Sequence, residues 1–209
     1  AASATATEAT AATAANAKSK KMKTKDLIYA GAFGALYIVL MLILVMSSGM
    51  VPILYVVAPI TVGIFCGTVY ELCVLKVRKF GPALIMGVLF ALVACSGAWY
   101  CMVTAIATSL LAELIIYLGK YKSKKMYLAS FVVFNINMSC PYMIMFFSRD
   151  FFIQRARDYY GDAYADGLLK LMTPGLWFYI VGFAIIGGIL GALVASKLIK
   201  KHFNKAGIV

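Results

Sequence analysis

The chain has 209 residues, of which 63% are hydrophobic and 13% are charged, and its mean hydropathy is +0.90. Soluble domains are about half apolar and about a quarter charged, so this composition excludes an ordinary soluble domain. The 20 Lys and Arg residues outnumber the 8 Asp and Glu residues, giving a net charge of +12 at pH 7. These basic residues form short clusters between long apolar runs, which is typical of a multi-pass membrane protein rather than a nucleic-acid-binding one.

The first 21 residues differ in composition from the rest. Residues 1–17 are almost entirely Ala and Thr, and lysines follow them. Such a low-complexity tract lacks the apolar run of a signal peptide and cannot form a core, so we expect a disordered tail over 1–21. Residues 22–209 are expected to form one transmembrane domain embedded in the lipid bilayer.

A helix needs about 20 apolar residues to cross a bilayer. Six stretches are candidates: 27–46, 52–75, 81–95, 99–118, 127–147 and 175–198. A short break at 96–98 separates the third stretch from the fourth. A single helix over 82–118 would be ~55 Å long, too long for one crossing. The sequence therefore predicts an all-α integral membrane protein with six transmembrane helices.

The basic residues predict the orientation of these helices. The N-terminal arm and the connections on its side of the membrane hold sixteen Lys and Arg, and the opposite side holds four: Arg149, Arg155, Arg157 and Lys170. By the positive-inside rule both termini lie in the cytoplasm, and the protein is placed in the plasma membrane. The external segment 148–174 has apolar residues at helical spacing between 151 and 172. We expect one interfacial helix there, which either caps a site or only connects the fifth and sixth spans.

The inventory of reactive residues argues against an enzyme. His202, the single histidine, lies in the basic C-terminal tail, and no Asp lies inside a span. No Ser–His or Cys–His pair can therefore form within the membrane, and no phosphate-binding or dinucleotide-binding glycine motif is present. The five cysteines form no CxxC pair, so we expect buried packing residues rather than a metal site: Cys66, Cys73, Cys95, Cys101 and Cys140. We expect no cofactor on this chain.

Two carboxylates lie inside predicted spans. Glu71 and Glu113 each stand near a cytoplasmic end, close to Lys76 and Lys120 respectively. An intramembrane carboxylate is a functional candidate because its exposure to lipid is costly. Pairing with the nearby lysine, coupling to an ion and contact with a partner protein all remain open for both residues.

Other polar residues form stripes on the fourth and fifth spans. Buried amides in hydrocarbon need hydrogen-bond partners, which either helix–helix contacts or a ligand in a pocket of the outer half would supply. Tryptophans mark the outer ends of the fourth and sixth spans, where an aromatic belt explains them equally well. An Arg next to an Asp at the pocket mouth fits anionic, cationic and zwitterionic ligands alike. The candidate substrate-binding residues are Trp99, Tyr100, Thr104, Asn135, Asn137, Tyr142, Arg149 and Trp177.

Small residues near the cytoplasmic start of the first span form a candidate helix-contact patch. The pairs Ala30/Gly34 and Gly31/Ala35 have the four-residue spacing that lets helices approach closely. We expect this patch to couple the chain to a partner, and a Gly34→Leu substitution to abolish the coupling while leaving the fold intact.

Three segments resemble a known family. The stretches are Met22–Ile28 (MKTKDLI), Lys76–Gly81 (KVRKFG) and Lys200–Ile208 (KKHFNKAGI), of which the last is the most specific. They are similar to the MptD, or Trep-Strep, family of substrate-binding S components of energy-coupling-factor (ECF) transporters. The resemblance covers residues 22–209, and the YGDAY stretch at 160–164 resembles the family's external segment.

The resemblance implies transport without catalysis by this chain. S components bind a vitamin or other micronutrient near the outer face and pair with a transmembrane T component and two cytoplasmic ATPases, which use the ATP. Their first helix carries an AxxxA-type contact, for which this chain offers Ala30-x-x-x-Gly34 and Gly31-x-x-x-Ala35. Two alternatives stay open: a self-contained secondary transporter or channel driven by an ion gradient, and a membrane scaffold without transport activity.

Overall fold

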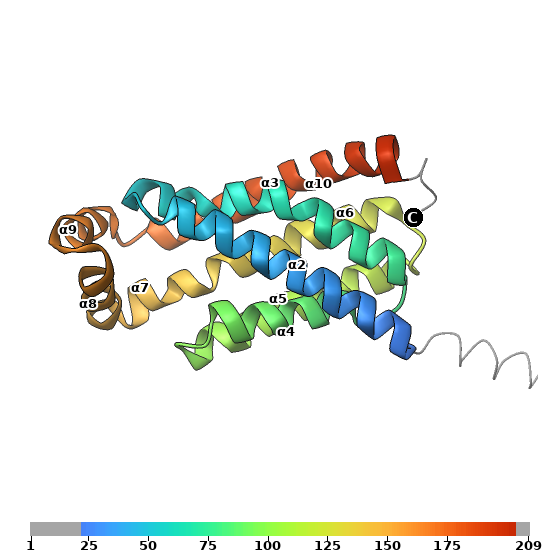
Figure 1. Ribbon diagram of the computed structural model, residues 1–209, viewed down its shortest axis with the longest axis horizontal. Helices are drawn as coiled ribbons and strands as arrows, with labels where there is room; N and C mark the ends of the chain where they lie inside the picture. Colours follow the sequence, from blue (N-terminus) through green and yellow to red (C-terminus); the bar gives the residue numbers. More distant parts are fainter. Residues whose placement is uncertain (1–21, 204–209) are drawn as a thin grey trace, which may run out of the picture.

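The computed structural model describes residues 22–203, and the tail predicted over 1–21 lies outside this range. The described residues form helices and turns and contain no strand (Figure 1). The long helices are α2 (Thr24–Ser48), α3 (Pro52–Val77), α5 (Trp99–Leu118) and α10 (Leu176–Leu198). The shorter elements are α4 (Pro82–Ala94), α6 (Lys124–Asn135), η1 (Ile136–Ser139), η2 (Pro141–Met143), α7 (Ile144–Phe147), α8 (Arg149–Tyr160), α9 (Asp162–Leu171) and η3 (Ile199–Phe203).

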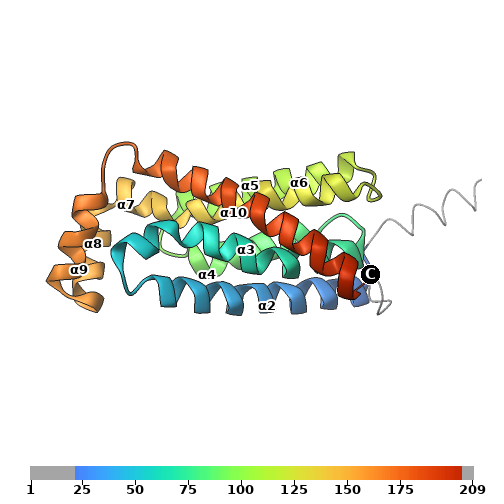
Figure 2. The same cartoon turned by 90° about the horizontal axis from the view of Figure 1, so that it is seen from above.

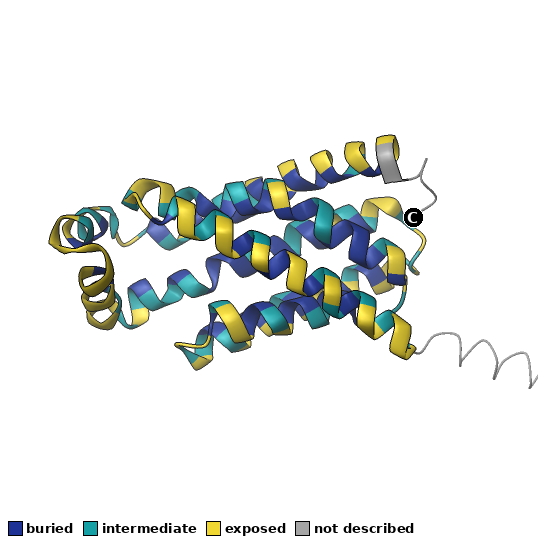
Figure 3. Cartoon of the chain, in the orientation of Figure 1, coloured by how far each residue is buried: buried dark blue, intermediate teal, exposed yellow. Residues whose placement is uncertain are grey.

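Five helical segments are long and apolar enough to cross a membrane: Thr24–Ser48, Pro52–Val77, Trp99–Leu118, Lys124–Phe147 and Leu176–Lys201. Exposed residues lie along the outward faces of these helices (Figure 3). Among them are large apolar side chains such as Leu36, Val39 and Ile43 on α2, each more than half exposed. A surface of this kind is stable in lipid and not in water. Five of the six predicted spans are thus confirmed as membrane-crossing candidates.

The third predicted span, 81–95, forms a shorter helix than expected. α4 has 13 residues, and at ~1.5 Å per residue it extends ~20 Å, less than the ~30 Å of the hydrocarbon layer. Pro82 starts it and the turn at residues 95–98 ends it, so α4 and α5 form a hairpin. This confirms that 82–118 is not one helix. The hairpin turn stops short of the end where α8 and α9 lie (Figure 1).

The fifth span is interrupted in the middle. Pro141 has no N–H and cannot donate to the Asn137 carbonyl, so the Cys140 N–H donates to it instead at 3.0 Å. This tighter bond belongs to the 3₁₀ turns η1 and η2, which separate α6 from α7. The uninterrupted helix expected over 127–147 is therefore wrong in its centre, although the whole segment still spans the bundle.

The connection between α7 and α10 contains two helices where one was expected. Gly161 lies between α8 and α9 with φ of 85° and ψ of 172°, a conformation that side chains disfavour. Arg157 at the end of α8 forms ion pairs with Asp162 at 3.0 Å and Asp166 at 3.5 Å, both on α9. The chain therefore folds back on itself and the two helices lie side by side (Figure 2).

The elements have two distinct ends. α2 begins and α10 ends at one end of the bundle, together with the loops 78–81 and 119–123 (Figures 1 and 2). We call this the basic end, since the clusters Lys23/Lys25, Lys76–Lys79, Lys120–Lys125 and Lys197–Lys201 lie there. The helices α8 and α9 lie at the opposite end, the α8–α9 end.

Glycines bring α3 and α10 into close contact at the centre of the bundle. A Cβ atom on Gly187 or Gly191 of α10 would overlap the backbone of Pro59 or Gly63 of α3. The small residues of the sixth span therefore serve packing inside this chain.

Candidate functional site

A pocket lined by aromatic rings lies at the α8–α9 end. Its volume is about 220 Å³, and it is enclosed by the end of α2, the start of α3 and the pair α8–α9. We call it the aromatic pocket; the side chains that characterise it are Tyr55, Phe152, Arg155, Tyr159, Tyr160 and Tyr164. An apolar and aromatic hollow with few polar groups is the usual form of a small-molecule site.

The rings of this pocket are held in place by stacking. The Tyr160 and Tyr164 rings lie 4.6 Å apart at an angle of 30°, and the Tyr55 and Phe152 rings lie 6.3 Å apart at 25°. Partial burial, with a smaller contribution from Tyr160, raises the pKa of Tyr164 to about 12. The Tyr164 hydroxyl is therefore neutral at physiological pH and can donate a hydrogen bond to a ligand.

The pocket contains one basic side chain, Arg155. Its guanidinium lies 5.2 Å from the centroid of the Phe151 ring, which orients it at the edge of the pocket. An apolar floor with a guanidinium at the edge suits a ring-bearing ligand with a negative group. Sequence reasoning missed these residues, although the repeated tyrosines at 159, 160 and 164 were a visible signal.

The polar residues predicted to bind substrate form hydrogen bonds within the bundle. Asn135 Nδ2 donates to the Pro59 carbonyl at 3.2 Å and to the Ala184 carbonyl at 2.7 Å, which links α6 to α3 and α10. Asn137 Nδ2 donates to Ser109 Oγ at 2.7 Å, and its Oδ1 contacts the Thr108 hydroxyl. Both amides are fully buried, and these contacts join helices to one another.

Of the remaining candidates, Trp99, Tyr100 and Thr104 lie close together on α5, whereas the others lie elsewhere. The Thr104 hydroxyl donates to the Tyr100 carbonyl at 2.9 Å, and the Tyr100 hydroxyl lies 3.0 Å from Ser148 Oγ. Trp99 is 75% exposed at the hairpin turn, whereas Trp177 Nε1 is buried with no hydrogen-bond partner in the described chain.

Arg149 and Asp150 line an open hollow of about 380 Å³ that is formed mostly by α8, with Leu169 of α9. Tyr142 is buried against Tyr55, behind the aromatic pocket, with the two rings 4.9 Å apart. The eight predicted residues therefore do not share one of the cavities described here, and of the eight, Tyr142 packs directly against the wall of the aromatic pocket.

Glu113 has a structural role. Its Oε2 accepts the backbone N–H of Ala83 at 2.9 Å and that of Leu84 at 3.4 Å. These are free donors in the first turn of α4, and a carboxylate there also interacts favourably with the helix dipole. Glu113 on α5 thus caps α4. Glu71 lies in a different setting, described below.

The first-helix patch divides between two faces. Ala30 and Gly34 are buried, and a Cβ atom on Gly34 would lie 2.6 Å from Leu89 Cδ1 of α4. A Cβ atom on Gly31 would meet nothing within 4 Å, and Ala35 is exposed. Only the pair Gly31/Ala35 faces outward among these four, so the side chain of a Gly34→Leu variant would point against α4 and not toward a partner.

The described residues contain no group of three or more His, Cys, Asp or Glu side chains that could hold a metal ion. All five cysteines are buried and unpaired. The side chains that line the aromatic pocket offer a ligand ring stacking, hydroxyl groups and one guanidinium.

Five apolar helices with exposed apolar faces define a multi-pass integral membrane protein. The chain belongs to the Trep_Strep family, because the model of that family, a hypothetical bacterial integral membrane protein, matches residues 24–205. No curated protein and no solved structure matches the chain.

Proposed function

We propose that this chain is the substrate-binding S component of an ECF-type importer, which captures a vitamin or other micronutrient outside the cell. The observation that carries the proposal is the aromatic pocket beneath α8 and α9, at the opposite end from the basic end. A ligand captured there by α8 and α9 would be held at the membrane face where an importer first meets its substrate.

The orientation follows from charge. The basic end would face the cytoplasm of the plasma membrane, with both chain ends on that side, because Lys and Arg are retained on the cytoplasmic side. Sixteen of the twenty basic residues belong to that end or to the segments that continue from it. The α8–α9 end, and with it the aromatic pocket, would then face outward.

Energy would come from partners. The chain would pair with a T component and two ATPases, which hydrolyse ATP, and would itself bind no cofactor. The pair Gly31/Ala35 on the outward face of α2 supports this pairing, because two small residues one turn apart let a partner helix approach the backbone closely. This pair lies toward the basic end, on the side where the ATPases would be.

Co-purification tests the proposal. The chain is co-expressed with a T component and its two ATPases, and the complex is recovered through a tag on the T component. We expect a stoichiometric four-chain complex. Recovery of the T component and ATPases without this chain, under conditions where an established S component assembles with the same module, would contradict the proposal. Uptake into vesicles without ATP would instead favour a secondary transporter.

Ligand binding tests the pocket separately. A micronutrient library is screened by the rise in melting temperature that binding causes, about 2.7 kcal/mol of stabilisation at 100 times the Kd. Tyr164→Ala should remove the rise for the ligand found. Tyr179→Ala, on the exposed face of α10, is the matched control and should preserve it. A library without any stabilising member would favour the scaffold alternative.

A further inference from the structure

A second cavity lies at the basic end, on the opposite side of the protein from the aromatic pocket. It is enclosed by the ends of α3 and α10, the start of α6 and the turn η3, and its volume is about 390 Å³. That volume is about ten times the ~30 Å³ that a water molecule occupies in the liquid, and it falls within the ~300–1,000 Å³ of small-molecule sites. The cavity can therefore hold a group larger than a few water molecules.

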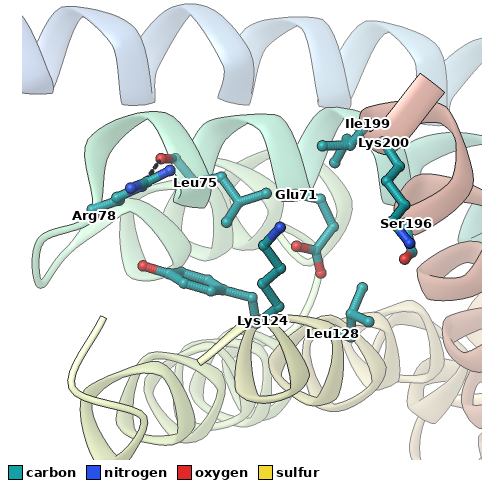
Figure 4. A pocket seen from close by; sticks show the side chains of 9 residues that line it. Glu71, Leu75, Arg78, Lys124, Leu128, Ser196, Ile199 and Lys200 are labelled. Carbon is teal, nitrogen blue, oxygen red and sulfur yellow. Dashed lines mark hydrogen bonds between the residues drawn. The ribbon is translucent and has the colours of Figure 1, made fainter. Parts of the chain in front are cut away.

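A buried carboxylate points into this cavity. Glu71 is 1% exposed, and its Oε1 has no hydrogen-bond partner among residues 22–203. Figure 4 shows the side chain directed from α3 into the space between α6 and α10. Glu113, by contrast, has its Oε2 satisfied by the backbone of α4. Burying a carboxyl group without a hydrogen-bond partner costs free energy. A cationic or hydrogen-donating ligand group beside Glu71 would offset this cost, because the surrounding helices do not supply such a group to Oε1.

Three basic side chains surround the mouth of the same cavity. Arg78, Lys124 and Lys200 come from three different elements and are exposed. The Lys124 and Lys200 side chains extend toward the space that Glu71 faces (Figure 4). Within residues 22–203, neither lysine forms an ion pair with Glu71. The lining thus carries one carboxyl group at depth and three basic side chains at the mouth.

This arrangement of charge selects among ligands. A simple cation bound to Glu71 would be repelled by the three basic groups, and a simple anion bound by those groups would face Glu71. A zwitterion satisfies both sets, with its cationic group inward and its anionic group at the mouth. The apolar side chains of Leu75, Leu128 and Ile199 complete the wall and can pack against the carbon atoms of such a ligand.

We propose that this cavity binds a phosphoethanolamine group. The primary ammonium would donate hydrogen bonds to the Glu71 carboxylate, and the phosphate would lie between Lys124, Lys200 and Arg78. A phosphate suits the excess of positive charge at the mouth, because charge-assisted hydrogen bonds to Lys and Arg are the strong ones. The group can come from two sources: the headgroup of phosphatidylethanolamine in the surrounding leaflet, or soluble phosphoethanolamine. This site is independent of the proposed transport partners.

Lipid and soluble probes test the site. The purified, delipidated chain is mixed with phosphatidylethanolamine, phosphatidylcholine or phosphatidylglycerol, and the retained lipid is counted by native mass spectrometry. Soluble phosphoethanolamine and phosphocholine are tested in parallel by calorimetry. We expect the ethanolamine compound of at least one series to bind about tenfold more tightly than its choline counterpart, which has no N–H to donate to Glu71. The series that shows the preference identifies the source.

Variants test whether the preference for ethanolamine over choline arises in this cavity. Glu71→Gln should remove the preference for ethanolamine over choline, and Lys124→Gln with Lys200→Gln should weaken all phosphate-bearing probes. Lys122→Gln, in the loop beside the cavity but outside its lining, is the matched control and should change neither. Leu128→Trp fills the cavity without altering a charge and should abolish retention, which keeps the test valid if Glu71→Gln does not fold.

Two results would overturn the proposal. One is equal binding of the ethanolamine and choline compounds by the native chain in both series. The other is an ethanolamine preference that survives both Glu71→Gln and Leu128→Trp. Neither result depends on whether a T component binds, so failure of this site and failure of the proposed transport function can be told apart.

Discussion

The Tyr142 hydroxyl donates a hydrogen bond of 2.5 Å to the Tyr55 carbonyl. Tyr55 lies four residues before Pro59 in α3, so its carbonyl is the one that proline leaves without a helical donor. Tyr142 itself lies in η2, where Pro141 interrupts the fifth span. The hydroxyl of Tyr142 in the interrupted fifth span thus satisfies the α3 carbonyl that Pro59 leaves without a donor. This hydrogen bond lies directly behind the aromatic pocket that Tyr55 lines.

Tyr142→Phe should destabilise the protein because it leaves the Tyr55 carbonyl buried without a donor. We expect a loss of about 1–3 kcal/mol, measured as a lower melting temperature in detergent. Tyr159→Phe, on a side chain that is 74% exposed, removes the same oxygen and should change the melting temperature little.

Pro59→Ala provides a second check on the same bond. Alanine restores an N–H that can donate to the Tyr55 carbonyl, so Tyr142→Phe should cost less in that background than in the native chain. An equal cost in the two backgrounds would show that the Tyr142 hydroxyl does not compensate for Pro59.

Glu113→Ala should loosen α4. The substitution removes the acceptor for the Ala83 and Leu84 N–H groups, and loss of a helix cap typically costs about 1 kcal/mol. Glu113→Gln keeps an acceptor oxygen but loses the charge, so its effect should be smaller. Hydrogen exchange reports the result residue by residue. Faster exchange confined to the first turn of α4 is expected, and unchanged exchange in both variants would contradict the capping role.

Most of the helical architecture was predictable, because membrane spans depend on length and apolar composition alone. The fourth prediction, 99–118, coincides with α5, and the break at residues 96–98 separates α4 from α5 as expected. The length of α4 was harder to predict, because its sequence is as apolar as that of a full span. The turn at residues 95–98 ends the helix after 13 residues.

The candidate site was less predictable, because the direction in which a side chain points depends on how the helices pack against one another. Asn137 and Thr104 are polar residues at membrane depth, which fits a pocket and a packing contact equally, and in the structure they hydrogen-bond within the bundle. The aromatic pocket forms where residues of α2 and α3 meet residues of α8 and α9, about a hundred positions away in the sequence. No local sequence pattern predicts this long-range contact. The sequence predicts one helix across Gly161, where the chain instead folds back and forms the pocket wall.

The first-helix patch divides between a buried face and an outward face, and we expect substitutions on the two faces to have different effects. Gly34→Leu should lower the melting temperature, because the space between α2 and α4 at that position is filled by Leu89 and Met86. Ala35→Leu lies on the exposed face and should preserve the melting temperature while reducing recovery of the complex with a T component. Normal recovery with Ala35→Leu would remove the outward pair Gly31/Ala35 from the proposed interface.

Alkaline titration should reveal the environment of Tyr164. Its pKa is raised from the ordinary value of about 10 to about 12, so the folded state favours the neutral hydroxyl. The resulting stability is fully present below about pH 10 and is lost as the pH rises through about 12. The ultraviolet difference between the native chain and Tyr164→Phe should therefore show a tyrosinate that forms near pH 12. A difference signal that titrates near pH 10 would place Tyr164 in water and outside the pocket wall.

Gly161→Ala should weaken ligand capture. The glycine adopts φ of 85° and ψ of 172°, which an alanine reaches only at a cost of about 1–3 kcal/mol. No atom lies within 4 Å of the position a Cβ would take, so the cost comes from the backbone and not from a clash. The strain is relieved if α8 and α9 change their relative direction, which moves Tyr160 away from Tyr164. We expect weaker binding at the aromatic pocket with little change in melting temperature, while Gly182→Ala, at an open position on α10, should preserve binding.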